Sequence, residues 1–268
     1  AGYATDDTKF ARYWPADLHL VGKDIIKFHC ALWPAMLMSA GVPLPNRVFA
    51  HGHFTVDGEK MSKTIGNVVN PVDVAADYGN DPLRFFLLRE IPFGGDGDFS
   101  FARLIKRYND DLGNELGNLV YRVATMTEKY FDGKAPGGAE GSLDDAWTAY
   151  EKAMDEIDFS AALDAVWGVL RYANRMIDVE KPWVLAKSDR PRLAVVLAAL
   201  LERLRHVAWM LSPFLPDTAA KMFTTLGIAK EERDKSYASA KIWGGLPEGA
   251  TITKGEPLFP KREGPPAA

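Results

Sequence analysis

Apolar residues in the first 100 positions follow two different spacings. Residues 18–21 (LHLV) and 47–51 (RVFAH) are short runs bounded by Gly, Pro or Asn, which is typical of buried strands. Between them, apolar and aromatic residues recur every three or four positions, which predicts a helix over 24–40 with an inward-facing stripe: Ile25, Phe28, Leu32, Trp33 and Met36. Pro34 should bend or interrupt this helix, because proline lacks the backbone N–H. A strand, a helix and a second strand form a βαβ unit, and such units build parallel sheets.

Beyond about residue 100, only helical spacing remains. It predicts a bundle of helices over 101–130, 143–157, 159–180 and 190–212, with breakers between them such as DGKAPGGAEG at 132–141. We assign four aromatic residues of these helices to the core: Trp167, Tyr172, Trp209 and Phe214. The tail from residue 227 is rich in Gly, Pro and charge, so we expect little packed core there beyond Ile242 and Trp243.

The predicted fold is therefore α/β over residues 1–100, all-α over 101–226, and a tail over 227–268. Two parallel strands cannot bury both of their faces, so they need neighbouring strands that this sequence does not contain. The sequence also begins with Ala1 and not with methionine. We therefore expect the chain to be the C-terminal piece of a longer protein.

Composition limits the partners. Of the 268 residues, 47% are hydrophobic and 25% are charged, as in ordinary globular proteins, and the net charge is −4. No global positive field attracts nucleic acid, so any anionic partner must bind a local patch. The single cysteine, Cys30, excludes an internal disulfide and fits a reducing cytoplasm. The longest wholly apolar run, 193–201, is too short to cross a membrane.

One loop concentrates positive charge directly after a strand-like run. In DGEKMSKTIGN, residues 57–67, Lys60, Ser62 and Lys63 fall within four positions. Open α/β sheets bind ligands at the carboxyl ends of their strands, and ammonium groups, a hydroxyl and backbone N–H groups suit a polyphosphate. The alternative is a solvated hairpin loop with ordinary surface lysines.

A second motif lies upstream. In VGKDIIKFHCALWP, residues 21–34, the chain leaves the first strand through Gly22. Asp24 either caps the helix or accepts a hydrogen bond from a ribose hydroxyl. His29 lies four residues from both Ile25 and Trp33, so the three share a face. It is either a hydrogen-bonded core histidine or part of a binding pocket.

GKDIIKFHCALWP and HGHFTVDGEKMSKTIGN together resemble the second half of the catalytic domain of class I aminoacyl-tRNA synthetases, and among these the methionyl-tRNA synthetases. The family's KMSKS loop matches residues 60–64, where Thr64 replaces the last serine and keeps a hydroxyl. Weaker motifs extend the resemblance to about residue 215. It implies the C-terminal portion of a Rossmann-type nucleotide-binding sheet, an all-α anticodon-binding bundle, and a part in methionine–tRNA ligation.

The resemblance also implies site residues. Lys60 and Lys63 would be catalytic, neutralising charge on the α-phosphate and the departing pyrophosphate of ATP. ATP, with Mg²⁺, would contact Gly22, Asp24, His51, Gly52, Phe54, Lys60, Met61, Ser62, Lys63 and Thr64. The side chain of L-methionine would lie among Ile25, Phe28, His29 and Trp33. Such a pocket is chemically reasonable, because a polarizable thioether packs well against aromatic edges.

Three features of the family are missing from the sequence: the His-x-Gly-His motif, the carboxylate that binds the substrate amine, and the zinc-knuckle cysteines. The HGH at 51–53 does not replace the first, because it follows a strand. All three precede the matching region in relatives. We therefore expect a missing N-terminal half as partner, a zinc knuckle only in that half, no metal site in this chain, and no activity of this segment alone.

The helical half carries candidates for reading RNA. Asn114, Asn118 and Arg122 are spaced four apart, and asparagine is unfavourable inside helices. The two asparagines either bond between helices or contact unstacked bases. Trp183, which follows Pro182, is either core packing or a stacking platform. The resemblance places these four residues where methionyl enzymes read the anticodon of tRNA(Met).

Three rival functions remain at this stage. The first is another class I aminoacyl-tRNA synthetase, for cysteine or leucine. The second is a small-molecule nucleotidyltransferase on the same type of sheet, which would leave the helical bundle without a purpose. The third is an RNA-binding module that keeps a relic of the lysine loop.

Overall fold

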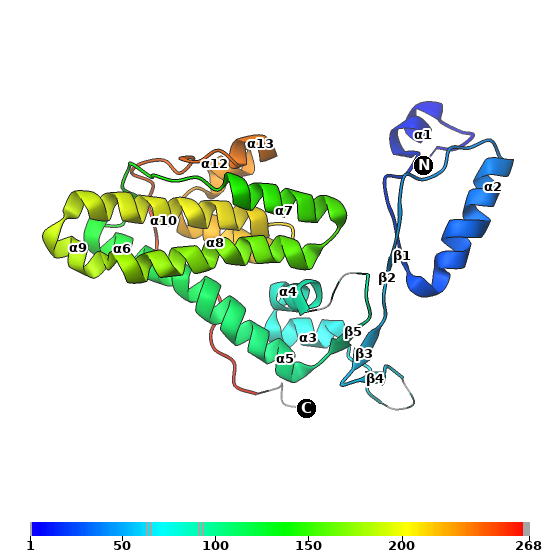
Figure 1. Ribbon diagram of the computed structural model, residues 1–268, viewed down its shortest axis with the longest axis horizontal. Coiled ribbons are helices and arrows are strands. Elements are labelled where there is room, and N and C mark those ends of the chain that lie inside the picture. Colours follow the sequence, from blue (N-terminus) through cyan, green and yellow to red (C-terminus); the bar gives the residue numbers. More distant parts are fainter. Residues whose placement is uncertain (1, 63, 65, 91, 93, 265–268) are drawn as a thin grey trace. The chain divides into compact units, whose positions relative to one another are not determined.

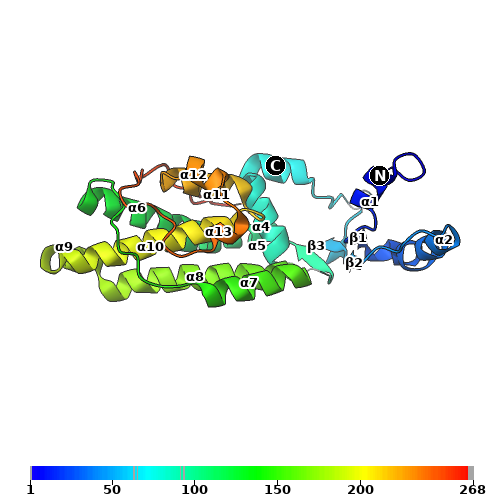
Figure 2. The same ribbon diagram turned by 90° about the horizontal axis from the view of Figure 1, so that it is seen from above.

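The computed structural model describes residues 2–62, 64, 66–90, 92 and 94–264, which form two compact units (Figures 1 and 2). The first unit comprises Ala1–Val68 and Ile91–Phe99, and it carries the strands. The second comprises Val69–Glu90 and Ser100–Ala268, and it is helical. The predicted order, a small parallel sheet followed by a helical bundle, is confirmed.

The first unit contains the predicted βαβ arrangement. Strands β1 (His19–Gly22) and β2 (Val48–His51) pair in parallel, in a register that joins His19 to Val48 and Gly22 to His51. The connection between them contains a 3-10 turn at Lys23–Ile25, a π-helical segment at Phe28–Leu32 and helix α2 at Trp33–Ser39. Helix α1 (Asp7–Tyr13), which the sequence pattern did not reveal, precedes β1 and is capped by Asp6.

Pro34 does not end the helical run: it lies in the first turn of α2, directly after the π-helical segment. The backbone N–H of Trp33 reaches five residues back, to the carbonyl of Phe28. The predicted inward-facing stripe is wrong for the described chain: Phe28 and Leu32 are each 56% exposed and Met36 is 62% exposed. The reason is physical, since a sheet of two strands offers too little surface to cover a whole helical face.

A second sheet was not predicted. Its strands are β3 (Phe54–Val56), β4 (Glu59–Lys60) and β5 (Gly97–Phe99), in the order β4-β3-β5. Strand β3 pairs antiparallel with β4 and parallel with β5. Each strand has two or three residues, which is too short to produce a readable alternation of apolar and polar positions.

The predicted helices of the second unit are confirmed within a residue or two. The region 101–130 forms α5 (Phe101–Arg107), a π-helical segment (Tyr108–Gly117) and α6 (Asn118–Phe131). The other predicted helices are α7 (Asp144–Glu156), α8 (Phe159–Glu180) and α10 (Arg190–Leu211). Further helices are α3 (Pro71–Tyr78), α4 (Asn80–Glu90), α9 (Pro182–Ser188), α11 (Pro216–Thr225), α12 (Ala229–Arg233) and α13 (Tyr237–Ala240). Within the described ranges, none of the helices combines the length and apolar character that a bilayer crossing requires.

Helices α3 and α4 pack with the helical unit, although they fall within the predicted 1–100 domain. Asp81 on α4 accepts a hydrogen bond of 2.6 Å from the N–H of Thr218, in the first turn of α11. Arg84 donates to the carbonyls of Pro213 and Phe214, at 2.8 and 2.9 Å, just after α10. These polar contacts attach α4 to the turn between α10 and α11.

Helix α10 is the centre of the helical unit and packs against α6, α8, α9 and α11 (Figure 1). It is buried on nearly all sides from Leu193 to Leu211, and the buried residues include the charged side chains of Glu202, Arg203 and Arg205. Trp167 and Phe214 are buried as predicted. Tyr172 is not, because 58% of its surface is exposed and its ring packs under the guanidinium of Arg203.

A buried charge network connects α10 to the tail. The carboxylate of Glu202, fully buried, accepts hydrogen bonds of 2.9 Å from the N–H groups of Gly244, Gly245 and Leu246, and bonds of 2.7 and 3.0 Å from Arg205. Burial alone would raise the pKa of Glu202, but hydrogen bonds from His206 and Arg205 outweigh it and lower the pKa to about 2. The carboxylate is therefore ionised inside the core.

His206 is neutral in this network. Burial lowers its pKa, and its Nδ1 accepts a hydrogen bond of 2.9 Å from the indole of Trp147. The ring hydrogen is therefore on Nε2, which lies 3.2 Å from Glu202 Oε1 and donates to it.

The tail carries more core than predicted. Ala240, Ile252 and Phe259 are buried, whereas Ile242, one of the two predicted core residues, is 64% exposed. The difference arises because the backbone of the tail bonds to Glu202, and this places Ile242 at the surface while its carbonyl accepts from Arg205 at 2.7 Å.

Replacing Glu202 by Gln should lower the free energy of unfolding at pH 7 by about 3–5 kcal/mol, because it leaves Arg205 buried without its counter-charge. The pKa of Glu202 is lowered on folding, so its ionisation stabilises the fold above pH 4.5, and this contribution is lost as the pH falls from 4.5 toward 2. Urea unfolding between pH 7 and pH 3 measures both effects. The exposed residue Glu231 offers the control, Glu231→Gln, and equal stability of the two variants would contradict the prediction.

Candidate functional site

Polar groups gather at the carboxyl ends of β1 and β2. Gly22 and His51 are the last residues of these strands and lie opposite each other in the sheet. The carboxylate of Asp24 folds back over Gly22, so that a Cβ at position 22 would lie 2.6 Å from Asp24 Oδ1 and 3.9 Å from the His51 ring. Three of the predicted ATP contacts, separated by 29 residues of sequence, are therefore brought together.

Asp24 is an exposed hydrogen-bond acceptor. Its pKa is lowered, first by its own backbone N–H and then by a hydrogen bond from His53, whose Nε2 lies 3.5 Å away. Its side chain is 64% exposed. Asp24 does not cap the helix here, because the 3-10 turn at Lys23–Ile25 has Gly22 at its N-cap and no side-chain cap bond.

Asp96, which the sequence did not suggest, connects the two motifs. Its carboxylate accepts from Lys23 Nζ at 2.5 and 2.6 Å and from the backbone N–H of His53 at 2.8 Å. These bonds, that from Lys23 first, lower the pKa of Asp96. The GGDGD run at 94–98 was the available signal, since clustered Gly and Asp mark a turn.

Gly52 permits a close backbone approach in the same region. A Cβ at this position would lie 2.0 Å from the carbonyl oxygen of Gly95, which no local adjustment accommodates. The segment after His51 is therefore pressed against the 94–96 segment. Phe54, the next predicted ATP contact, is half-buried in β3 and pairs with Gly97.

The described residues of the lysine loop make local hydrogen bonds. Lys60 is exposed at the end of β4, and Met61 and Ser62 are half-buried. The backbone N–H of exposed Thr64 donates to Ser62 Oγ at 3.2 Å. Lys63 lies outside the described residues.

Asn67 bonds to two backbone groups of the lysine loop and was not predicted from the sequence. Its Oδ1 accepts from the N–H of Ser62 at 2.8 Å, and its Nδ2 donates to the carbonyl of Lys60 at 3.2 Å. The signal that could have found it is the position of an asparagine directly after Gly66, because asparagine side chains commonly bond to turn backbones.

Of the four predicted methionine contacts, one pair is joined in the structure and the other two residues lie apart from it. Ile25 and His29 are joined, since His29 Nδ1 lies 3.1 Å from the carbonyl of Ile25. Trp33 packs edge-on against Trp14, with ring centroids 6.0 Å apart, and Phe28 is largely exposed. An apolar hollow of about 330 Å³ includes Trp33 but not the other three; it is lined by Tyr3, Phe10, Trp14, Trp33, Met36, Leu37, Ala40 and Val42.

Trp14 and His19 extend this aromatic group and were not predicted. The His19 ring lies edge-on to His29, with centroids 6.1 Å apart, and 6.0 Å from the Trp14 ring. His19 Nδ1 is buried and has no hydrogen-bond partner among the described residues. The only sequence signal was a histidine inside an apolar strand, which is more often structural than functional.

The predicted anticodon contacts are at the surface of the helical unit. Asn114 lies in the π-helical segment and Asn118 opens α6; both are exposed, and in the described part of the chain neither amide makes a hydrogen bond. Trp183 on α9 is 46% exposed. In the described part of the chain, Trp183 is therefore not a core residue, and Asn114 and Asn118 do not form hydrogen bonds between helices. Arg122 is half-buried and lies 3.6 Å from Asp178, near the end of α8.

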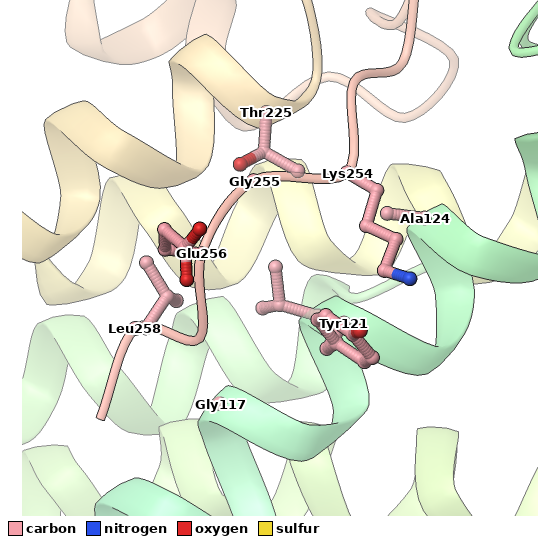
Figure 3. Close-up of a pocket in the computed structure, with 9 residues that line it drawn as sticks. Gly117, Tyr121, Ala124, Thr225, Lys254, Gly255, Glu256 and Leu258 are labelled. Carbon is pink, nitrogen blue, oxygen red and sulfur yellow. The ribbon is translucent and has the colours of Figure 1, made fainter. Parts of the chain in front are cut away.

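The tail supports helix α6 beside these residues (Figure 3). Lys254 lies over the ring of Tyr121, 4.5 Å from its centroid, and the backbone N–H of Lys254 donates to Glu128 at 2.8 Å. Phe259 packs against Gly117, where a Cβ would lie 3.5 Å from its ring. The remaining crevice has a volume of about 10 Å³, so it is a packing contact and not a ligand site.

Metal-binding side chains are dispersed. Across the described ranges, no three His, Cys, Asp or Glu residues are grouped so that they could hold a metal ion.

Each of two family models of known proteins matches about half of the chain. Residues 2–124 match the family model of class I tRNA synthetases (M), and residues 133–264 match that of the anticodon binding domain of methionyl tRNA ligase. The chain is 48% identical to a methionine–tRNA ligase of Caldanaerobacter subterraneus subsp. tengcongensis and 43% identical to one of Thermotoga maritima. Each alignment covers 97% of this chain but 42% of the relative, so the chain spans less than half the length of the curated relatives it matches.

A solved structure agrees with these matches. The methionyl-tRNA synthetase of Mycobacterium tuberculosis bound by methionyl-adenylate superposes with a TM-score of 0.87 at 40% identity, over 94% of this chain and 51% of that one. Its free form gives a TM-score of 0.86 at 38% identity. The family predicted from the lysine loop and the GKDIIKFH motif is confirmed. The chain belongs to the methionyl-tRNA synthetase family of class I aminoacyl-tRNA synthetases.

Proposed function

We propose that this chain supplies the lysine loop and the anticodon-binding helices of a methionine–tRNA ligase. The proposed enzyme joins L-methionine to ATP, forming methionyl-adenylate and pyrophosphate, and then transfers the methionyl group to tRNA(Met). The observation that carries this proposal is the convergence of Gly22, Asp24 and His51 at the strand ends. In open α/β sheets such an edge binds nucleotides.

The proposed first step is a displacement at phosphorus. A carboxylate oxygen of methionine bonds to the α-phosphorus of ATP, and the bond to the pyrophosphate oxygen breaks. Negative charge shifts toward the pyrophosphate, and the ammonium groups of Lys60 and Lys63 neutralise it. Asp24, ionised and exposed, accepts hydrogen bonds from the ribose. Mg²⁺ accompanies the triphosphate and stabilises the same charge.

Methionine is held by the group around His29. The exposed faces of Ile25 and Phe28 provide apolar surface, and the rings of His29 and Trp33 provide edges for the thioether. The bond between His29 and the carbonyl of Ile25 fixes the orientation of the imidazole. We assign the four residues to one pocket that is completed by the N-terminal part of the enzyme.

The helical unit reads the anticodon. The exposed amides of Asn114 and Asn118 offer donors and acceptors to base edges, while Arg122 offers a cation. The exposed indole of Trp183 offers a stacking surface. We place the complete ligase in the cytoplasm, where its tRNA substrate is used.

Replacing Lys60 by Ala in the full-length ligase should lower the rate of methionine activation about 100- to 1000-fold, because one cation that faces the developing charge is lost. Exchange of labelled pyrophosphate into ATP measures this rate. Binding of tRNA should not change. Lys9→Ala, an exposed lysine on α1, is the control, and equal activation in the two variants would refute the role of Lys60.

Replacing His29 by Ala should raise the KM for methionine and leave the KM for ATP nearly constant, because the change affects only the amino-acid pocket. The same exchange assay, run at varied concentrations of each substrate, separates the two constants. The exposed neighbour Cys30 offers the control Cys30→Ala. A raised KM for ATP alone would remove His29 from the pocket.

Replacing Trp183 by Ala should weaken tRNA(Met) binding about 5- to 150-fold, the range expected for loss of one stacked base. Adenylate formation should remain normal, since Trp183 belongs to the helical unit. Aminoacylation and pyrophosphate exchange, measured in parallel, test this difference. Tyr172→Ala is the control for loss of an exposed aromatic ring, and equal losses in both assays would show that Trp183 is structural.

A further inference from the structure

Lys60 is carried by a very short hairpin. Strands β3 and β4 are joined by Asp57 and Gly58, with φ of 49° and 81°, which is the two-residue turn with positive φ at both positions. The ladder contains two residue pairs, Thr55 with Lys60 and Val56 with Glu59. A hairpin this short is marginal by itself, so two pairs cannot fix the direction of Lys60.

Strand β5 lies on the opposite side of β3: it pairs with β3, and the N–H of Asp57 donates to the carbonyl of Phe99 at 3.1 Å. Asp98 on β5 adds a side-chain contact to this support. One carboxylate oxygen, Oδ1, accepts from the Thr55 hydroxyl at 2.6 Å and from the backbone N–H of Gly58 at 2.7 Å. The Gly58 N–H is the turn donor that the hairpin ladder does not use. A single charged group therefore holds both the middle of β3 and the tip of the turn.

The sheet places Asp98 in line with Lys60. Thr55 pairs with Lys60 on one side and with Asp98 on the other. Residues directly opposite each other project from the same face of a sheet, so the three side chains form one row. The backbone of Lys60 itself is held by Asn67, whose Nδ2 donates to the Lys60 carbonyl at 3.2 Å.

We propose that Asp98 is a positioning residue for the adenylation step, which acts by holding the β3–β4 turn so that Lys60 faces the phosphates. This inference rests on the proposed function of Lys60. Asp98 itself does not touch substrate. Its effect is geometric, and a displacement on the order of 1 Å of a catalytic group is enough to lower a rate about 100-fold.

The test is a double-mutant cycle in the full-length ligase. Asp98→Ala should lower the rate of activation between about 10- and 100-fold in the presence of Lys60, and should cause no further loss in the Lys60→Ala background. Asp98→Asn, whose side-chain oxygen still accepts from Thr55 and Gly58, should recover part of the rate. The KM for methionine should be unchanged in all of these variants.

Thr55→Val provides a second route, since it removes one of the two donors and keeps a residue that favours strands. Its loss of activity should be smaller than that of Asp98→Ala and should also vanish in the Lys60→Ala background. If Asp98→Ala does not fold, the Thr55 cycle alone decides. Losses that are equal with and without Lys60, or no loss at all, would overturn the positioning role. If instead Lys60→Ala leaves activation intact, it is the proposed function that fails.

Discussion

The helical unit depends on the burial of one carboxylate, that of Glu202. It lies on a helix that is surrounded by packed side chains, where an unpaired charge would be very unfavourable. The three backbone N–H groups of residues 244–246 and the guanidinium of Arg205 stabilise it, and they bring the tail with them. The tail then continues to Lys254 and Phe259, which pack against α6. The tail therefore packs against α6, the helix that carries Asn118 and Arg122.

The first unit uses exposed polar groups in a different way. Its sheets are small, and two carboxylates of the 94–98 segment add hydrogen bonds to them. Asp96 accepts from the side chain of Lys23 and the N–H of His53, and Asp98 accepts from the hydroxyl of Thr55 and the N–H of Gly58. These bonds are partly exposed, so each one stabilises the fold only slightly. Their contribution is to the orientation of the side chains and backbone groups that they bond.

Much of this could be predicted from sequence, and the successes share a cause. Long helices such as α8 and α10 repeat their apolar spacing often enough to be read, and the lysine loop is a local motif whose residues are adjacent. The failures depend on contacts between distant residues. Asp96 and Asp98 bond to partners 40 or more residues away in the sequence. The exposed stripe at Phe28 reflects the size of the sheet, and the burial of Ile252 depends on the path of the tail. Local patterns carry no information about such contacts.

The turn at Asp57 and Gly58 has a chemical consequence as well. An aspartate followed by glycine is prone to isomerisation, because the glycine nitrogen can attack the aspartate carboxyl group and form a cyclic imide. Reopening of that ring inserts an extra methylene into the main chain. In this protein the same nitrogen is engaged with Asp98 at 2.7 Å. The nitrogen that this reaction requires is therefore the same atom that donates to Asp98, two residues before Lys60.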